Sequence, residues 1–158
     1  MKKRLLLLTG VCALFLVITS CSKSDNDDDD GPKAPTKTEL LTKATWKFNK
    51  AEAGGIDVTN QLPDCLVDNT ITFNSSEERK GTGVADEGAD KCGATQNTSF
   101  SWTLNSAETT LTSDKALFTG GSTDFTIVSL TESEFVTTQV MTVPGFPAPM
   151  NVKLTMKH

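Results

Sequence analysis

The chain has 158 residues, of which 15 are basic and 20 acidic, so its formal net charge at pH 7 is −5. This acidic balance argues against nucleic-acid binding, which needs clustered Lys and Arg side chains to neutralise phosphates. The length is enough for one domain with its own hydrophobic core.

The first twenty residues have the three parts of an export signal. Residues 1–4 are mostly basic, residues 5–18 are mostly apolar, and two small residues, Thr19 and Ser20, stand directly before Cys21. The apolar run is too short to cross a bilayer core, which needs about 20 apolar residues. We therefore predict that residues 1–20 are a signal peptide that is removed on export.

The end of this segment, Val17-Ile18-Thr19-Ser20-Cys21, resembles the lipobox of bacterial lipoproteins. The resemblance implies that the Cys21 thiol is acylated and that Cys21 becomes the first residue of the mature protein. Each buried methylene of an acyl chain contributes about 0.8 kcal/mol, so two or three chains give a stable membrane anchor. The alternative is an ordinary secretory peptide that a cysteine follows by chance.

Residues 22–37 contain no apolar residue larger than Ala or Pro. Such a stretch cannot bury enough surface to offset its ordering entropy, so we predict a disordered, lipidated tether over residues 21–37. The run Asn26-x-Asp28-x-Asp30-Gly31 resembles the start of an EF-hand loop, but Lys37 stands where the loop requires Glu. We therefore predict no calcium site and no other metal site.

The acidic run directly after the lipidated cysteine also resembles the surface-export signal of Bacteroidota lipoproteins. This resemblance implies that the protein is anchored in the outer membrane and faces the cell exterior. The alternative is a solvated spacer on a protein that faces the periplasm.

From Thr38 to His158 the composition is that of a folded domain. Residues 38–43 predict a short helix with Thr38 as its N-cap. The chain then alternates apolar and polar residues with a period of two, which is typical of strands with one buried face. We predict eight strands, at residues 45–52, 69–74, 78–86, 97–104, 108–115, 122–130, 133–142 and 149–157.

Short connections between these strands favour antiparallel neighbours, so the predicted class is all-β. Eight up-and-down strands can close into a barrel, which removes the exposed edges. A two-sheet sandwich is the alternative that the pattern leaves open. Residues 57–68 are too long for a hairpin and contain Pro63, so we predict a loop folded across one end of the barrel.

Two cysteines belong to the predicted domain. Cys65 lies in the loop 57–68, and Cys92 lies in a second polar loop, residues 86–96. An even pair in an exported protein predicts a disulfide, which in the chain-entropy model contributes about 3–4 kcal/mol. Two free thiols would need metal or catalytic partners, and no histidine is near in the sequence.

Several short motifs of the domain resemble the lipocalin-like domains of Bacteroidota lipoproteins. They are Leu40-Leu41 with Ala44-Thr45-Trp46-Lys47-Phe48, Pro63-Asp64-Cys65, the segment 69–74, Cys92, Ser101-Trp102-Thr103-Leu104, and the segment 125–130. The resemblance covers residues 38–158. It implies an eight-stranded barrel, Trp46 near its closed end, and an apolar ligand cavity.

The chain departs from lipocalins at two points. Lipocalins open with Gly-x-Trp and place an Arg over the Trp, whereas here Ala44 replaces the Gly, and Lys153 or Lys157 would have to take the place of the Arg. Both a ligand cavity and a barrel filled by its own side chains therefore stay open. Large inward residues could line the cavity or fill it, and these are Trp46, Phe73, Phe100 and Trp102.

The apolar loop 143–149 offers another candidate contact, Phe146, which either meets a ligand or partner or folds back over the barrel end. Catalytic residues are scarce, since the one histidine, His158, is the last residue and is expected to be frayed. Glu77 and Glu78 would point to opposite faces of a strand, which does not suit an acid–base pair. We therefore expect no enzyme activity and no cofactor.

The sequence thus predicts a lipid-anchored binding module for a small apolar ligand or a partner protein. The alternative is a non-catalytic structural or accessory protein whose barrel is filled and holds no small ligand.

Overall fold

The computed structural model describes residues 33–93 and 97–158, and residues 34–158 form one compact unit. The predicted signal peptide, the acylation site Cys21 and the tether up to residue 32 lie outside the described residues. The elements are α1 (Lys37–Thr42), β1 (Trp46–Ala53), β2 (Ile56–Asp57), the 3₁₀ turn η1 (Thr59–Gln61), α2 (Asp64–Val67), β3 (Thr70–Glu77), β4 (Lys80–Asp86), β5 (Asn97–Leu104), β6 (Thr110–Ser113), β7 (Asp124–Leu130), β8 (Glu134–Met141) and β9 (Met150–Lys157).

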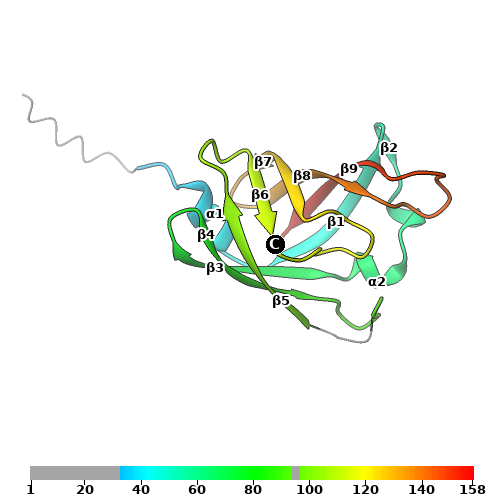
Figure 1. Ribbon diagram of the computed structural model, residues 1–158, viewed down its shortest axis with the longest axis horizontal. Coiled ribbons are helices and arrows are strands. Elements are labelled where there is room, and N and C mark those ends of the chain that lie inside the picture. The colour runs from blue at the N-terminus through cyan, green and yellow to red at the C-terminus, as the bar shows by residue number, and fades with distance from the viewer. Residues whose placement is uncertain (1–32, 94–96) are drawn as a thin grey trace, which may run out of the picture. The chain divides into compact units, whose positions relative to one another are not determined.

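Eight of the strands form a closed antiparallel barrel, which confirms the predicted fold (Figure 1). Each of the strands β3 to β9 pairs with its neighbour in the chain, and β1 joins β3 to β9 and so closes the ring. The β1–β9 pairing extends from Lys47↔Lys157 to Ala53↔Val152, but β1 pairs with β3 only at its first two residues. The closed ring excludes an open two-sheet sandwich. The short strand β2, which was not predicted, pairs with the end of β1.

The predicted helix exists, but its predicted N-cap was wrong. Thr36 is the N-cap, and its hydroxyl accepts a hydrogen bond from the Glu39 backbone N–H at 3.2 Å, while the Glu39 carboxylate accepts one from the Thr36 N–H at 2.6 Å. Such a reciprocal capping box needs Glu three residues after the Thr, and only Thr36 has that spacing. Thr38 is buried instead, and its hydroxyl accepts a hydrogen bond from the Arg79 N–H.

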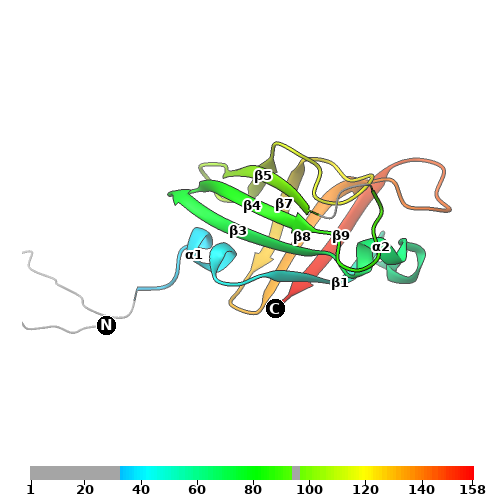
Figure 2. The same ribbon diagram turned by 90° about the horizontal axis from the view of Figure 1, so that it is seen from below.

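Helix α1 covers one end of the barrel, which we call the closed end (Figure 2). It is tied to two hairpin turns, because Thr38 bonds to Arg79, and the Lys37 ammonium donates to the Glu108 carbonyl at 2.5 Å. Arg79 and Glu108 both have left-handed backbones, with φ of 63° and 52°. The sharp turns that this conformation allows bring both backbones to the helix.

Trp46 is fully buried beneath α1, as the resemblance implied, and its indole N–H donates to the Leu41 carbonyl at 2.8 Å. The expectation that His158 is frayed was wrong. Its ring lies 4.1 Å from the Trp46 ring, and its Nε2 lies 2.6 Å from the Glu132 carbonyl oxygen. The physical reason is that β9 stays paired up to Lys157, so the terminal residue is held beside Trp46.

Neither Lys153 nor Lys157, the two candidates for the place of the Arg in lipocalins, lies over Trp46. The Lys153 ammonium pairs with Glu52 at 2.5 Å, and that of Lys157 lies 3.6 Å from Glu134. Both lysines alternate with the inward residues of β9 and so face outward. His158 therefore takes the place over Trp46 that the family pattern gives to an Arg.

Small residues on β4 make room for the large rings of its neighbours. The inward positions of β4 are Gly81, Gly83 and Ala85, and β5 places Phe100 and Trp102 beside them. A Cβ atom at Gly83 would lie 2.3 Å from Phe100 Cζ and 2.6 Å from the Thr72 carbonyl oxygen. The barrel wall at β4 is therefore fitted to the aromatic core.

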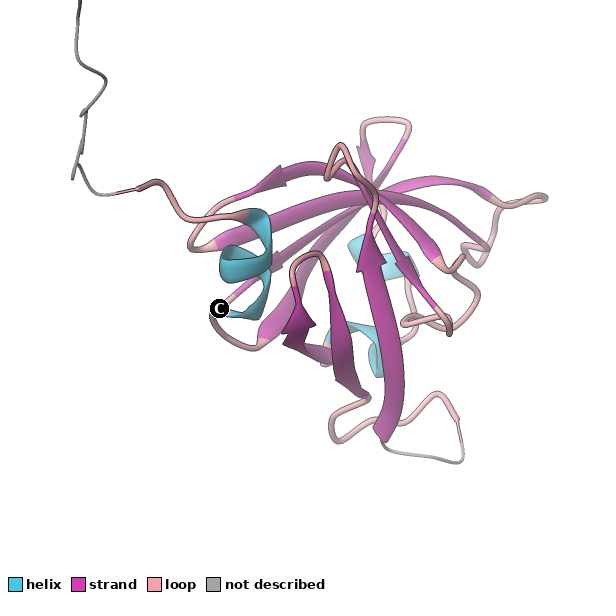
Figure 3. Cartoon of the chain, turned by 60° about the vertical axis from the view of Figure 1, so that its left-hand side comes forward, coloured by secondary structure: helices cyan, strands magenta, loops and turns pink. Residues whose placement is uncertain are grey.

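The opposite end, which we call the disulfide end, is covered by the segments 54–69, 87–93, 114–123 and 142–149 (Figure 1). Figure 3 shows the few short helical segments, in cyan, beside the magenta strands of the barrel. The predicted loop 57–68 contains two short helical turns, η1 and α2. Val58 and Leu62, on either side of η1, and Leu66 in α2 are buried. The Cys65–Cys92 disulfide is present, with a Cα–Cα distance of 5.1 Å, which confirms the predicted pair. It joins α2 to the segment after β4.

A charged cluster on the outer face of β1 predicts acid sensitivity. Hydrogen bonds from Lys153 and then Lys50 hold the pKa of Glu52 below its ordinary value of 4.5, and hydrogen bonds from Thr59 lower the pKa of Asp57. A pKa lowered on folding gives stability above the unfolded-state pKa that is lost as the pH falls through the folded one. We expect Glu52→Gln to melt below the wild type at pH 7, and the difference to shrink towards pH 3.

Thermal unfolding monitored by circular dichroism from pH 3 to pH 7 measures this difference. Glu78→Gln, at an exposed turn, is the matched control and should follow the wild-type curve. A melting-temperature difference for Glu52→Gln that stays constant from pH 7 to pH 3 would contradict the expected coupling.

Candidate functional site

The four large residues predicted to line or fill the barrel interior all lie in its core. Trp46, Phe73, Phe100 and Trp102 are at most 3% exposed. The Phe73 ring centroid lies 5.5 Å from that of Phe100, 6.0 Å from Trp102 and 6.3 Å from Phe135. The Trp102 N–H donates to the Thr82 carbonyl at 3.0 Å. Phe73 thus joins Phe100 and Trp102, and Trp46 reaches the same cluster through Phe135, with ring centroids 5.6 Å apart. The role of the four residues as ligand contacts stays a prediction.

Phe146 lies at the disulfide end. Its position has features of both predicted alternatives, which are contact with a ligand or partner and a ring folded back over the barrel end. The residue is half-buried and packs against the core, while the flanking Pro144 and Pro147 are exposed. A turn closed by the hydrogen bond from the Phe146 N–H to the Val143 carbonyl, at 3.1 Å, directs the ring back towards the barrel. Its contact with a ligand or partner stays a prediction.

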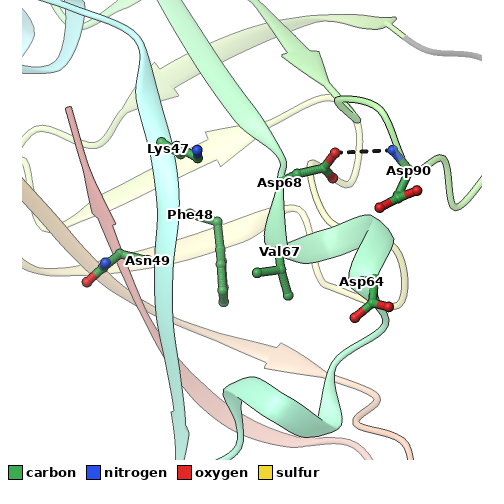
Figure 4. Close-up of a pocket in the computed structure, with 7 residues that line it drawn as sticks. All are labelled: Lys47, Phe48, Asn49, Asp64, Val67, Asp68 and Asp90. Carbon is green, nitrogen blue, oxygen red and sulfur yellow. Dashed lines mark hydrogen bonds between the residues drawn. The ribbon is translucent and has the colours of Figure 1, made fainter.

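A pocket of about 420 Å³ opens at the disulfide end (Figure 4). It arises beyond the two residues at which β1 pairs with β3. There β1 pairs with β9 on its other side, and α2 lies beside it. The side chains of Phe48 and Val67 point into the space between β1 and α2. The lining residues are Lys47, Phe48, Asn49, Asp64, Val67, Asp68 and Asp90.

Asp68 fixes the rim of this pocket. Its Oδ2 accepts hydrogen bonds from the Ala89 N–H at 2.7 Å and the Asp90 N–H at 3.1 Å. This contact and the Cys65–Cys92 disulfide both tie α2 to the segment after β4. The second carboxylate oxygen of Asp68, Oδ1, is buried without a hydrogen-bond partner among the described residues. The pocket is therefore held in shape by one covalent and two polar links.

The pocket combines an apolar floor with a polar rim. Phe48 is 5% exposed and Val67 is half-buried against the core, so together they offer a small hydrophobic surface. Three aspartates and one lysine surround them, which gives the lining a net negative charge. Within residues 33–93 and 97–158, no three His, Cys, Asp or Glu side chains are placed to hold a metal ion. The arrangement suits an amphiphilic organic molecule.

Sequence reasoning placed the loop 57–68 at a barrel end but missed this pocket. The alternating pattern marks β1 and β3 as strands, but it carries no signal of where two strands separate. The predicted disulfide between Cys65 and Cys92 was the one feature of the sequence that indicated that the loops 57–68 and 86–96 lie together.

The glutamates considered for catalysis lie at the closed end, beside a second pocket of about 380 Å³. Glu77 forms an ion pair with Lys80 at 2.9 Å, and Glu78 is exposed at the turn between β3 and β4. We still expect no catalysis at this site. Over the part of the chain that the structure describes, no helix has the length and apolar character needed to cross a membrane.

Comparison with known protein families gives a match to the lipocalin-like domain over residues 42–137, which is more than half of the chain. The matched segment runs from the end of α1 into β8 and includes Trp46, both disulfide cysteines and Trp102. No curated protein matches the chain significantly.

Proposed function

Because the chain belongs to the lipocalin-like domain family, we propose that it is a lipid-anchored, non-catalytic binding protein that holds a small ligand at the disulfide end. The closed barrel is consistent with ligand binding. The observation that carries the proposal is the pocket between β1 and α2, which has an apolar floor and a defined rim. The aromatic half of the interior is occupied by its own rings.

The lining indicates the kind of ligand. An apolar part would cover the half-buried Val67 and the small exposed edge of Phe48, and each Å² of apolar surface removed from water contributes about 25 cal/mol. A polar part, uncharged or positively charged, would face Asp64 and Asp90 at the rim. The ligand is thus a small amphiphile, with a polar end in addition to the apolar character that the sequence suggested.

The test is to fill the pocket. We expect native mass spectrometry of the protein purified from its own host membranes to show an added small-molecule mass. Val67→Trp should lose this mass, because the larger ring occupies the space beside Phe48. The matched control is Val128→Trp, since Val128 is 57% exposed on β7 and does not line the pocket. An added mass that survives in Val67→Trp would place the ligand elsewhere.

The second candidate function is an accessory protein with a filled barrel and no small ligand. The ring contacts of Phe73 with Phe100 and Trp102 favour it. It predicts no added mass in any variant. In that case Phe146 and the exposed loop around it are the place to search for a partner protein.

We propose that Cys21 carries the lipid anchor and that the tether after it holds the barrel at the outer face of the outer membrane. The tether ends earlier than the predicted residue 37, because Thr36 caps α1 and Lys37 is the first residue of that helix. The lipobox-like sequence and the acidic run support this proposal. We expect Cys21→Ser to leave the membrane fraction once residues 1–20 are removed, which the mass of the protein checks, because the acyl groups supply the proposed anchor. Cell fractionation and surface proteolysis measure the anchor and the facing side separately. A Cys21→Ser protein that stays with the membranes would contradict the anchor.

A further inference from the structure

Two polar side chains of β8 point into the barrel. Thr137 is 0% exposed and Gln139 is 3% exposed, and they alternate with outward residues on the same face as Phe135 and Met141. The Thr137 hydroxyl and both polar atoms of the Gln139 amide have no hydrogen-bond partner among the described residues. Buried polar groups in folded proteins nearly always have a partner, so this pair needs an explanation.

The surroundings of the pair are apolar and uncharged. Thr137 lies opposite Leu154 on β9 and Ile127 on β7, and Gln139 lies opposite Val152. In the part of the chain that the structure describes, the buried polar residues are Thr38, Asn69, Ser113, Thr137 and Gln139, and none is charged. A charged ligand group would lose its hydration there without gaining a counter-charge. A neutral group that both donates and accepts hydrogen bonds would match the Gln139 amide.

The pair lies beneath a loop at the disulfide end. A Cβ atom at Gly121 would lie 2.9 Å from the Gln139 Oε1, so the amide packs against the backbone of the segment 114–123. The same segment buries Leu117 and Phe118 against the core. An apolar molecule that entered from this end would displace loop side chains and leave the strands in place.

We propose that Thr137 and Gln139 form an interior site for the neutral, hydrogen-bonding end of an otherwise apolar molecule, of the carboxamide or alcohol class. The apolar remainder takes the place of the Leu117 and Phe118 side chains. Thr137 and Gln139 do not line the pocket between β1 and α2, and the site does not depend on a ligand there. The two sites are neighbours, because the Phe118 ring contacts the pocket residue Phe48, with the ring centroids 6.4 Å apart.

The experiment is a titration of ¹⁵N-labelled barrel protein with octanamide, followed through the side-chain NH₂ signals of Gln139. We expect these signals to shift and to saturate. Octylamine and, at pH 8, octanoate should bind at least ten-fold more weakly, because both are charged. Gln139→Met should weaken octanamide binding at least ten-fold, whereas the exposed Gln61→Met should not. Thr137→Val should also weaken octanamide binding. Thr138→Val, which changes the outward neighbour, is its matched control.

Thermal unfolding checks that the variants fold. Gln139→Met should melt at or above the wild-type temperature, because it removes unpartnered polar atoms from the core. Gln139 signals that stay fixed up to millimolar octanamide would overturn the proposal, and a structural water would then be the partner of the pair. Equal octanamide binding by Gln139→Met and the wild type would also overturn it. The Gln139 signals and the Gln139→Met variant report on the interior site itself, whereas ligand mass in Val67→Trp reports on the pocket between β1 and α2, so the two failures are distinguishable.

Discussion

Phe73→Ala should lower the free energy of unfolding by about 3–5 kcal/mol, the typical cost of removing a buried Phe side chain. Phe73 is 2% exposed, and its ring meets Phe100, Trp102 and Phe135 at edge-on angles of 80–86°. Edge-to-face pairs contribute beyond their buried area, so the loss of three such contacts adds to the cavity cost. Urea unfolding monitored by circular dichroism measures the change.

Phe73→Leu is the matched control, because it keeps most of the buried volume and should lose clearly less stability. The outcome also bears on function. If Phe73 lined an open ligand cavity, the ring would already lack contacts on one side. Its removal would then lower the free energy of unfolding by less. A loss below about 1 kcal/mol would contradict the filled aromatic core, since fully buried Phe residues cost more.

Replacing both disulfide cysteines, Cys65→Ala with Cys92→Ala, should cost about 3–4 kcal/mol. The bond spans a sequence separation of 27 residues, and in the chain-entropy model a loop of that length loses about this much when it is opened. The loss comes from the greater freedom of the unfolded chain, together with any loosening of the segments 57–68 and 87–93. Urea unfolding of the double variant, compared with the wild type before and after reduction, measures it.

The double variant also links stability to the pocket. Asp68 still bonds to Ala89 and Asp90 without the disulfide, so the barrel should stay closed while the pocket rim loosens. We expect a weaker ligand signal at a preserved barrel fold. A double variant that matches the wild type in both stability and ligand retention would show that the disulfide contributes neither to the stability of the fold nor to ligand binding.

The strands and the disulfide could be predicted because their physical causes are local. Alternation in the segment Phe100-Ser101-Trp102 and in Met150–Lys157 marks one buried face directly. β8 is different, because apolar residues occupy both phases, at Phe135 and Met141 on one face and at Val136 and Val140 on the other. Pairing with β7 and β9 decides that Thr137 and Gln139 face inward, so no pattern within the strand could reveal the polar pair.

The remaining differences between the predictions and the structure come from contacts between segments that are distant in the sequence. His158 stacks on Trp46 because the pairing of β9 with β1 and β8 carries the chain end there. The pocket forms where β1 leaves β3, which depends on the register of two strands whose paired residues, Trp46 with Ile71 and Lys47 with Thr70, lie more than twenty positions apart in the sequence. The N-cap at Thr36 could have been predicted from the sequence, because Glu39 stands three residues after it, at the spacing of a capping box.

The central claim is that ligands enter at the disulfide end while the aromatic half of the barrel stays filled. The most direct measurement is a ¹⁵N spectrum of the barrel recorded while an extract of the host membranes is added. The two indole N–H signals report on the core, since Trp46 donates to Leu41 and Trp102 donates to Thr82. We predict that both stay fixed while the signals of Phe48, Val67 and Asp90 shift. Shifts of both indole signals with a silent pocket would contradict the account.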